Sequence, residues 1–507
     1  MILETTAQGP ARLARPTTAD SPMPRTFGPG AVLVTAGIVL VLAAFRGDGL
    51  GFDGAALLPL YCLGLLFIGV LLWWEATQRP TGVLPSWTSP PALIAGWAFA
   101  WIYAPAIAPF FDSSLIGDFE RAQGGEAVLV TGLPLACVGL AVLSCSYHLV
   151  SRVLRANGPI AERIERYVPL RRVVAVYALG TCARALRLNT LGVAFGADLA
   201  GWGPLRSVDQ LIGYAEDLRF LALALLVAHV VRRRAGYVWL VIPLIVELVW
   251  GVSSGFLTPV VMAVLLCVAT AAAFERLRAR HIVLMASAAL VVSTFMPVIA
   301  AIRQDRLGAI GTADLIGVSE VLTTPAKYWL AGVSAGDGVY NKFFGRQTEV
   351  AAATGLVVTL TPSVVPYEGI DRFLTLPASL IPRVLWPDKP TLSRGVWFSS
   401  TFRGFKDDTT SYSAMTIFSE GYLFYGWTGA VLAMVILGAA LAVVRCRLDN
   451  PRLVLVYLAL VPTILQIEPE FSSYLTTLIQ RSVVFLVVFV LLTTREPVGL
   501  ERTQIHP

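Results

Sequence analysis

Four arginines lie deep inside long apolar stretches of the sequence, where a permanent charge is energetically costly. They are Arg184, Arg187, Arg219 and Arg481. A charged side chain near the centre of a bilayer costs roughly 2.5–3.5 kcal/mol on insertion scales, so four in contact with lipid would cost about 10 kcal/mol together. We therefore expect the four guanidinium groups to share a polar cavity. Because guanidinium forks onto phosphate oxygens, such a cavity suits a multivalent anion.

A second set of candidate residues lies in the polar stretch 303–413, which contains all four lysines of the chain. The charged and aromatic side chains that we single out there are Arg303, Arg306, Arg383, Trp386, Asp388, Lys389 and Arg394. Glu420 follows at the start of the next apolar run. A carboxylate here is suited to general base catalysis, and arginines beside it to stabilising a phosphorylated leaving group.

The composition identifies the type of protein that must hold these residues. The chain has 507 residues, of which 56% are hydrophobic and only 14% charged, and its mean hydropathy is +0.70. A soluble domain carries about a quarter charged residues, so this is a polytopic membrane protein. The six cysteines lie in or beside apolar runs and suggest no disulfide framework. The net charge of +6 is mostly arginine spread over short loops, which argues for membrane orientation and against nucleic acid.

Apolar runs of suitable length predict an all-α membrane protein of about twelve transmembrane helices. The runs are 31–45, 55–74, 91–110, 126–149, 171–197, 211–231, 237–250, 256–274, 281–302, 414–443, 453–468 and 473–494. Arginines gather on every second connection, so the positive-inside rule places both termini in the cytoplasm and the stretch 303–413 outside.

These assignments divide the chain into five parts. They are a disordered cytoplasmic tail at 1–29, nine helices in 30–302, one large extracytoplasmic loop at 303–413, three helices in 414–494, and a cytoplasmic tail at 495–507. The deep arginines then fall in the outer half of the membrane. Arg184 and Arg187 could instead extend to the membrane surface, and Arg219 and Arg481 could sit in structural ion pairs. Independent pairs would not all choose one half, so we favour the shared cavity.

Several kinds of active site are not supported by the sequence. It contains no G-x-x-x-x-G-K-[ST], H-E-x-x-H, G-x-S-x-G or D-x-D motif. All four histidines fall at predicted cytoplasmic ends, so no outward histidine catalyst is expected. Asp48, Asp53 and Asp112 could bind a divalent ion, but glycines beside the first two favour solvated turns. We therefore expect neither a metal nor another cofactor.

Two segments carry a resemblance to a known family. They are LPASLIPRVLWPDKP at 376–390 and SEGYLFYGWTG at 419–429. Together with the late outward loop, they resemble the bacterial O-antigen polymerases, also called oligosaccharide repeat-unit polymerases. The chain departs from the pattern at 253–256, where a basic residue is expected after the Ser-Gly step. The related O-antigen ligases use a histidine in their large outward loop. The stretch 303–413 contains no histidine, which favours a polymerase.

The resemblance implies a C-type membrane glycosyltransferase fold in the bacterial inner membrane. It implies an enzyme that joins undecaprenyl-pyrophosphate-linked oligosaccharides at the outer face, without a metal, and it allows for a chain-length regulator as a partner. The motif positions are Arg383, Asp388, Lys389 and Glu420. The residues predicted as catalytic are Glu420, Arg303, Arg383 and Asp388, with Glu420 as general base and Asp388 in reserve. Those predicted to bind substrate are Arg184, Arg187, Arg219, Arg306, Lys389, Arg394, Trp386 and Arg481.

Two other functions stay open from the sequence. One is a transporter of lipid-linked oligosaccharides or polysaccharides, although the single large loop and the lack of an internal repeat count against it. The other is a glycosyltransferase that uses a polyprenyl-monophosphate sugar, with a metal at Asp48 or Asp53.

Overall fold

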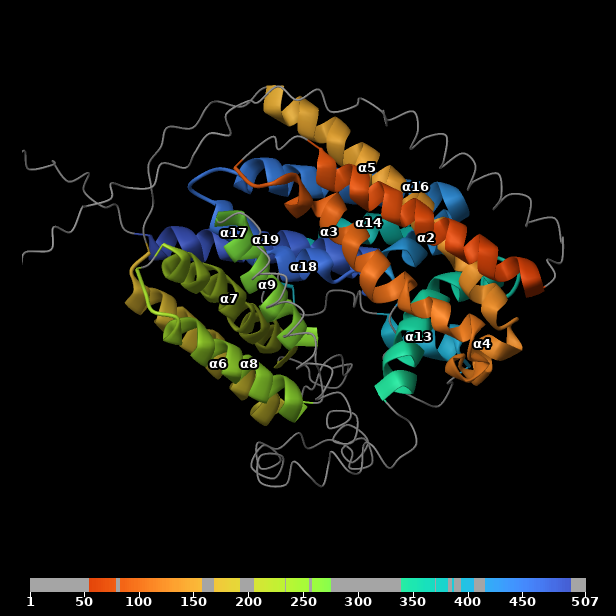
Figure 1. Ribbon diagram of the computed structural model, residues 1–507, viewed down its shortest axis with the longest axis horizontal. Helices are drawn as coiled ribbons and strands as arrows, with labels where there is room; N and C mark the ends of the chain where they lie inside the picture. The colour runs from red at the N-terminus through yellow and green to blue at the C-terminus, as the bar shows by residue number, and fades with distance from the viewer. Residues whose placement is uncertain are drawn as a thin grey trace, which may run out of the picture.

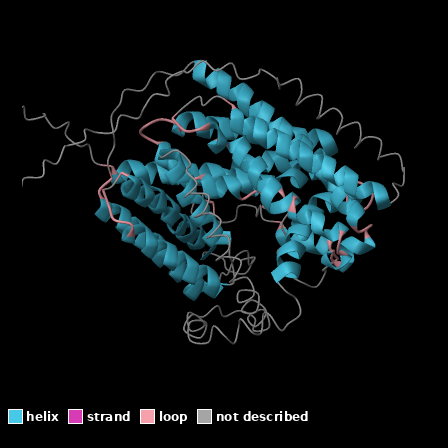
Figure 2. Ribbon diagram, viewed as in Figure 1, coloured by secondary structure: helices cyan, strands magenta, loops and turns pink. Residues whose placement is uncertain are grey.

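The described part of the protein is built from helices. This computed structural model describes residues 54–78, 83–156, 168–191, 205–232, 234–254, 258–274, 339–369, 371–381, 385–386, 394–404 and 415–493. Within these ranges every regular element is a helix and no strand is present (Figure 2). The all-α prediction is confirmed for this part of the chain. Both predicted tails lie outside it.

Within the described ranges, five helical segments are long and apolar enough to cross a membrane. They are Ala56–Thr77, Pro90–Phe110, Glu126–Arg155, Ile417–Leu448 and Phe471–Leu492. Shorter apolar helices occupy Val238–Gly251, Thr258–Phe274 and Val454–Leu465. The predicted runs 31–45 and 281–302 lie outside the described residues, and the other predicted runs all fall on helices. The protein is therefore a helical membrane protein, while the number of twelve spans stays a prediction.

The helices form two groups (Figure 1). In the first group α5 (Glu126–Ala156) packs along α16 (Ile417–Leu448), with α2 (Gly54–Thr77) and α3 (Pro90–Trp97) against α5. Glycine allows the close approach of the two long helices, because a Cβ at Gly438 would lie 2.5 Å from a backbone carbonyl oxygen of α5. Small residues at such contacts are typical of helix packing in membranes.

The second group consists of the helices drawn in yellow and green in Figure 1. It contains α6 (Leu170–Leu191), α7 (Leu205–Val231), α8 (Val238–Ser254) and α9 (Thr258–Phe274), and α7 contacts the other three. Three further helices contact members of both groups. They are α17 (Val454–Ala459), α18 (Val461–Leu465) and α19 (Phe471–Leu492).

Part of the predicted loop 303–413 is a helix that packs into the first group. This helix, α13 (Val339–Leu360), lies against α5, and its residues 350–357 are all buried. The two backbones are so close that a Cβ at Gly355 would overlap the carbonyl oxygen of Val128. The sequence did not predict α13.

The later part of the predicted loop is also fixed to the helices. Arg403 follows α15 (Gly395–Phe402), and its guanidinium lies 3.3 Å from a carboxylate oxygen of Glu120 in α4 (Asp118–Ala122). The same guanidinium donates a hydrogen bond to the backbone carbonyl of Glu349 in α13 at 2.9 Å. Short α14 (Asp371–Leu380) contacts α19.

The long helix α16 is broken near its start. Tyr425 and Gly426 have non-helical dihedral angles, and Gly426 has a φ of 60°, in the left-handed region that favours glycine. A Cβ at Gly421 would lie 2.8 Å from that of Ala433, although twelve residues of straight helix would separate them by about 18 Å. The short first half of α16, residues 417–424, therefore folds back against the second half.

The break leaves backbone carbonyls without their helical hydrogen-bond donors. Residues 368–369 donate hydrogen bonds to two of these carbonyls. The N–H of Glu368 donates to the carbonyl of Leu423 at 3.0 Å, and that of Gly369 to the carbonyl of Phe424 at 3.1 Å. Irregular backbone at membrane depth occurs where protein or a water-filled cavity satisfies it. The break in α16 is therefore a place in the described helices where the backbone itself is already polar and bonded to another segment.

Candidate functional site

Two of the predicted arginines meet buried carboxylates between α6, α7 and α8. Arg184 donates a hydrogen bond to Glu247 at 3.0 Å. Arg219 lies between two carboxylates, 2.8 Å from Glu216 and 3.2 Å from Glu247. Arg184 and Arg219 are only 4% and 3% exposed, so these ion pairs are shielded from water.

The other two predicted arginines extend this cluster. Arg187 binds Asp209 at 2.6 Å and Glu216 at 3.3 Å. Arg481 of α19 forks onto Asp217 of α7, with nitrogen–oxygen distances of 2.6 and 2.9 Å. Asp217 follows Glu216 directly in the sequence, so the two parts of the cluster are joined through α7.

Positive and negative charges balance in this cluster, which we call the arginine network. Its members are Arg184, Arg187, Arg219 and Arg481 with Asp209, Glu216, Asp217 and Glu247. The structure thus brings all four predicted arginines into one buried polar cluster. Each of them already faces a carboxylate, so their positive charges are compensated inside the protein without a bound anion.

Glu420 is buried beside the break in α16, with 2% of its surface exposed. The backbone N–H of Ser472 donates to its carboxylate at 2.7 Å, and the hydroxyl of Ser472 donates at 2.8 Å. Ser472 lies in the first turn of α19, so Glu420 also supplies a helix cap there. The predicted base is therefore held in one orientation by two donors.

Glu470 lies next to this site, immediately before α19, and is 1% exposed. One carboxylate oxygen accepts a hydrogen bond from the backbone N–H of Arg394 at 2.8 Å, while the other is buried with no hydrogen-bond partner. Burial, and after it the charge of Glu420, raises the pKa of Glu470 to about 7. Glu420 and Glu470, which we call the carboxylate pair, thus include one group that titrates near neutral pH.

Arg394 connects the carboxylate pair to the segment that covers the break. Its guanidinium forms a two-pronged ion pair with Glu368, one prong measuring 2.6 Å. It also lies 3.6 Å from the ring centre of Trp397. Arg394 is 5% exposed, so this predicted substrate-binding residue is enclosed by its own partners. Trp386, by contrast, is 39% exposed.

The remaining predicted site residues lie outside the described part of the chain. They are Arg303, Arg306, Arg383, Asp388 and Lys389, and the candidate metal ligands Asp48 and Asp53. Their roles stay predictions. Within the described residues, no three or more His, Cys, Asp or Glu side chains are grouped as a metal site would require.

Buried ionisable groups also occur at the ends predicted to face the cytoplasm. Glu75 is 1% exposed and lies 3.0 Å from a ring nitrogen of His148. Arg445 is 3% exposed and lies 3.1 Å from Asp449. Buried charge is therefore less confined to the predicted outer half of the membrane than the sequence indicated.

Sequence reasoning did not select Glu470, Glu368 or Ser472 for the site. A signal was present for Glu470, because acidic residues gather at helix N-termini and Glu470 comes just before the apolar run 473–494. Glu368 carried no such signal. Its role follows from the break in α16, which brings residues 366–369 against Arg394 and the freed carbonyls.

Comparison with known proteins adds a domain but no activity. A family model described as a domain of unknown function (DUF8712) matches residues 202–450. This stretch extends from the start of α7 to the end of α16, so it includes Glu420 but not α19. No curated protein and no solved structure matches the chain.

Proposed function

We propose that the protein is a membrane glycosyltransferase that joins undecaprenyl-pyrophosphate-linked oligosaccharide repeat units at the outer face of the bacterial inner membrane. The observation that carries the proposal is the buried Glu420 at the break in α16, placed beside Glu470 and the Arg394–Glu368 pair. Buried carboxylates at a helix break are suited to proton transfer. The motif resemblance around Arg383 and Glu420 supplies the substrate class.

In the proposed reaction, Glu420 accepts the proton of an acceptor hydroxyl. The oxygen of that hydroxyl forms a bond to C1 of the donor sugar, and the bond from C1 to the pyrophosphate oxygen breaks. The lipid pyrophosphate leaves with its electron pair, and Arg303 and Arg383 stabilise its charge. Arg219 and Arg481 have no part in this step, because the carboxylates of Glu216 and Asp217 already hold their guanidinium groups.

The proposal is tested with purified protein and lipid-linked repeat units in detergent, without an ion gradient and with a chelator present. We expect longer lipid-linked products. Arg303→Ala and Arg383→Ala should abolish these products while the protein is produced at normal levels. Full-length polymer from both variants in cells would refute the assignment, and activity lost only in chelator would favour the metal-dependent enzyme.

A transporter is the second candidate, and the arginine network is the observation that favours it. Buried, paired ionisable residues mark ion and substrate pathways in many membrane proteins. Uptake of a lipid-linked oligosaccharide across sealed vesicles, without any lengthening of the product, would decide for this function.

A further inference from the structure

The two members of the carboxylate pair are held where the start of α16 meets the start of α19. The carboxylate of Glu420 accepts hydrogen bonds from the backbone N–H of Ser472 at 2.7 Å and from its hydroxyl at 2.8 Å. The backbones are joined as well, because the N–H of Ile417 donates to the carbonyl of Ile467 at 3.1 Å. These contacts bring two buried carboxyl groups into one corner of the protein.

The two carboxyl groups differ in how their oxygens are satisfied. Both oxygens of Glu420 lie within hydrogen-bond distance of Ser472. One oxygen of Glu470 accepts a hydrogen bond from the backbone N–H of Arg394 at 2.8 Å, and the other has no hydrogen-bond partner among the described residues. Burying a charged oxygen without a donor is costly, and binding a proton removes that charge. The geometry therefore places a proton on Glu470.

The charged side chains near Glu470, among those that the structure describes, come from three other segments. They are Glu420 of α16, Arg394 just before α15, and Glu368 after α13, which holds the guanidinium of Arg394. Burial, and after it the charge of Glu420, raises the pKa of Glu470 to about 7, although Arg394 acts in the opposite direction. Two like charges that interact in this way do not titrate independently.

We propose that the carboxylate pair holds one proton between its two members, and that Glu470 keeps this proton while Glu420 is ionised. Neutralising Glu420 removes the like charge that holds the proton on Glu470, so Glu470 then releases it.

This inference rests on the proposed function for the source of the incoming proton. The acceptor hydroxyl gives its proton to Glu420, and Glu470 gives a proton to water. The pair still holds one proton, and Glu420 returns to its ionised form when its proton passes to Glu470. Glu470 therefore acts through Glu420 and does not touch the substrate.

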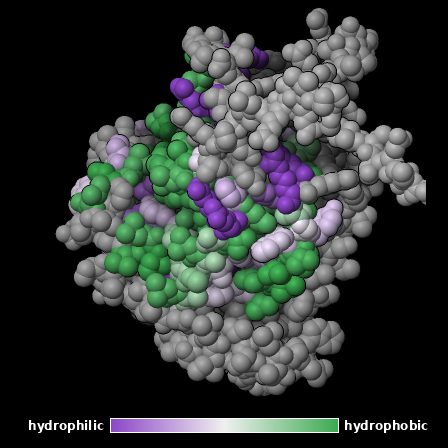
Figure 3. Space-filling model, turned by 90° about the vertical axis from the view of Figure 1, so that its left-hand side faces the viewer, coloured by the Kyte–Doolittle hydropathy of each residue, from purple (hydrophilic) through white to green (hydrophobic). Residues whose placement is uncertain are grey.

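The test is labelling of the full-length protein in detergent with dicyclohexylcarbodiimide, which reacts with protonated carboxyl groups. The carboxyl O–H adds across one C=N bond of the reagent, and the adduct rearranges to a stable N-acylurea that keeps the whole mass of the reagent. The reagent dissolves in lipid, and Figure 3 shows hydrophobic side chains among hydrophilic ones on the described surface of one face. Peptide mass spectrometry identifies the labelled residue.

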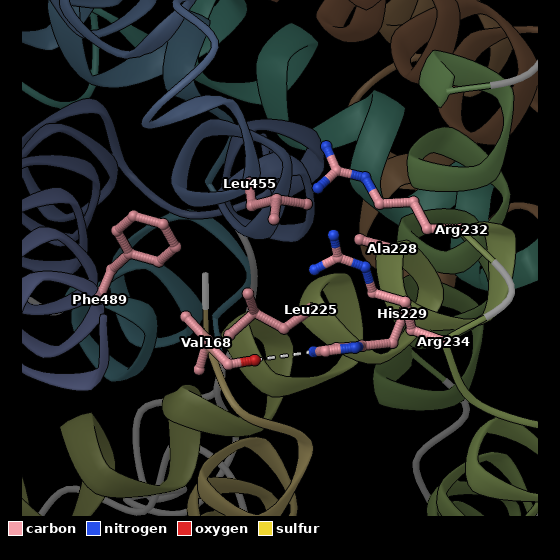
Figure 4. A pocket seen from close by; sticks show the side chains of 8 residues that line it. All are labelled: Val168, Leu225, Ala228, His229, Arg232, Arg234, Leu455 and Phe489. Atoms are coloured by element: carbon pink, nitrogen blue, oxygen red, sulfur yellow. Dashed lines mark hydrogen bonds between the residues drawn. The ribbon is translucent and has the colours of Figure 1, made fainter. Parts of the chain in front are cut away.

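A label for carboxyl groups is needed because histidines also titrate near neutral pH. One of them, His229, is buried in a pocket that is also lined by Phe489 of α19 (Figure 4). A ring nitrogen of His229 lies 2.9 Å from the carbonyl of Val168. Phe489 is about 28 Å along α19 from Glu470, so this histidine is remote from the carboxylate pair.

We expect the label on Glu470 in the unmodified protein, with labelling lost as the pH rises through about 7. In Glu420→Gln the neighbouring charge is gone, so the loss should move to lower pH by about 1 unit or more. Glu468→Gln is the matched control, because Glu468 lies on the same segment but pairs with Arg346 at the surface. It should leave the labelling of Glu470 and its pH dependence unchanged.

Three results would overturn the proposal. They are an unlabelled Glu470, labelling that is constant with pH, and an unshifted pH dependence in Glu420→Gln. If Glu420→Gln does not fold, the pH dependence of labelling in the unmodified protein still decides.

Lengthening of lipid-linked repeats by the same preparations separates this inference from the proposed function. An unlabelled Glu470 in active protein refutes the inference alone. A labelled Glu470 with the expected shift, in protein that makes no product, supports the shared proton and refutes the proposed function alone.

Discussion

The arginine network and the carboxylate pair show two ways in which this protein buries charge. In the network, four guanidinium groups meet four carboxylates, and the charges balance. At the break in α16, the carboxylate of Glu420 accepts its hydrogen bonds from Ser472, and Glu470 keeps one oxygen without a partner. A balanced cluster resists change, because losing one member leaves a buried charge uncompensated. The unbonded oxygen of Glu470 can take a proton, so the reaction proposed above uses the carboxylate pair and leaves the network a structural role.

The largest expected effect is on activity, from Glu420→Gln. The amide keeps an oxygen that accepts hydrogen bonds from Ser472 but cannot accept the proton of an acceptor hydroxyl. Product formation should fall by about 10²- to 10⁴-fold, the usual contribution of a general base. The measurement is lengthening of lipid-linked repeats by purified protein. Ser472→Ala is the matched control, and it should retain most of the activity. Normal polymer from Glu420→Gln would remove this residue from the mechanism.

The next effect is on stability, from Arg481→Leu. This change leaves Asp217 buried and unpaired, so unfolding should require about 3–5 kcal/mol less free energy. The double variant Arg481→Leu/Asp217→Leu should recover most of the loss, because it removes both charges. Thermal unfolding in detergent measures each value. A double variant that folds well but makes no polymer would show that the network takes part in catalysis, which would break the contrast drawn above.

Glu470→Gln tests the pH dependence of the carboxylate pair. The pKa of Glu470 is raised from 4.5 to about 7, so the folded state binds its proton more tightly than the unfolded state. The stabilising contribution is therefore present below pH 4.5 and is lost as the pH rises toward 7. Between pH 4.5 and 8 the free energy of unfolding of the unmodified protein should fall, relative to that of Glu470→Gln, by up to about 2–3 kcal/mol. Unfolding measured at several pH values in this range tests the difference. A constant difference across this range would contradict the assignment.

The smallest effect is expected from Gly426→Ala at the break. A side chain at a φ of 60° costs about 1–2 kcal/mol, and the new Cβ would also lie 2.9 Å from the hydroxyl of Tyr367. Gly345→Ala in α13 is the control, because no atom lies within 4 Å of its new Cβ. If both variants unfold alike, the geometry of the break adds nothing to stability.

The sequence predicted most helices of the described region. A long apolar run inside a membrane must bond its own backbone groups, and a helix does this within one segment. It missed α13 because Lys342, Arg346 and Glu349 lie in the first half of that helix. These charges shorten the apolar stretch around the buried residues 350–357 below the length expected of a membrane helix. It also read the start of α16 as continuous helix. The pair of glycines at Gly426 and Gly429 was the available sign of the break, since glycine is costly in a helix interior.

The candidate site was harder to predict because its partners are distant in sequence. The sequence selected all four arginines of the network, but Arg481 meets an aspartate 264 residues away. Glu420 was selected as well, and its nearest donor lies 52 residues away on another helix. Residue types and depth therefore identify which side chains need partners, whereas only the packing of α6, α7, α8 and α19 decides which partners they receive.

The position of α19 makes it a mechanical link between the two charged regions. Its first turn holds the carboxylate of Glu420 through Ser472, and Arg481, nine residues later and about 14 Å further along the axis, grips α7 through Asp217. The helix α19 therefore has one fixed contact at each of the two charged regions. A shift of α19 along its axis would change the distances at both contacts together.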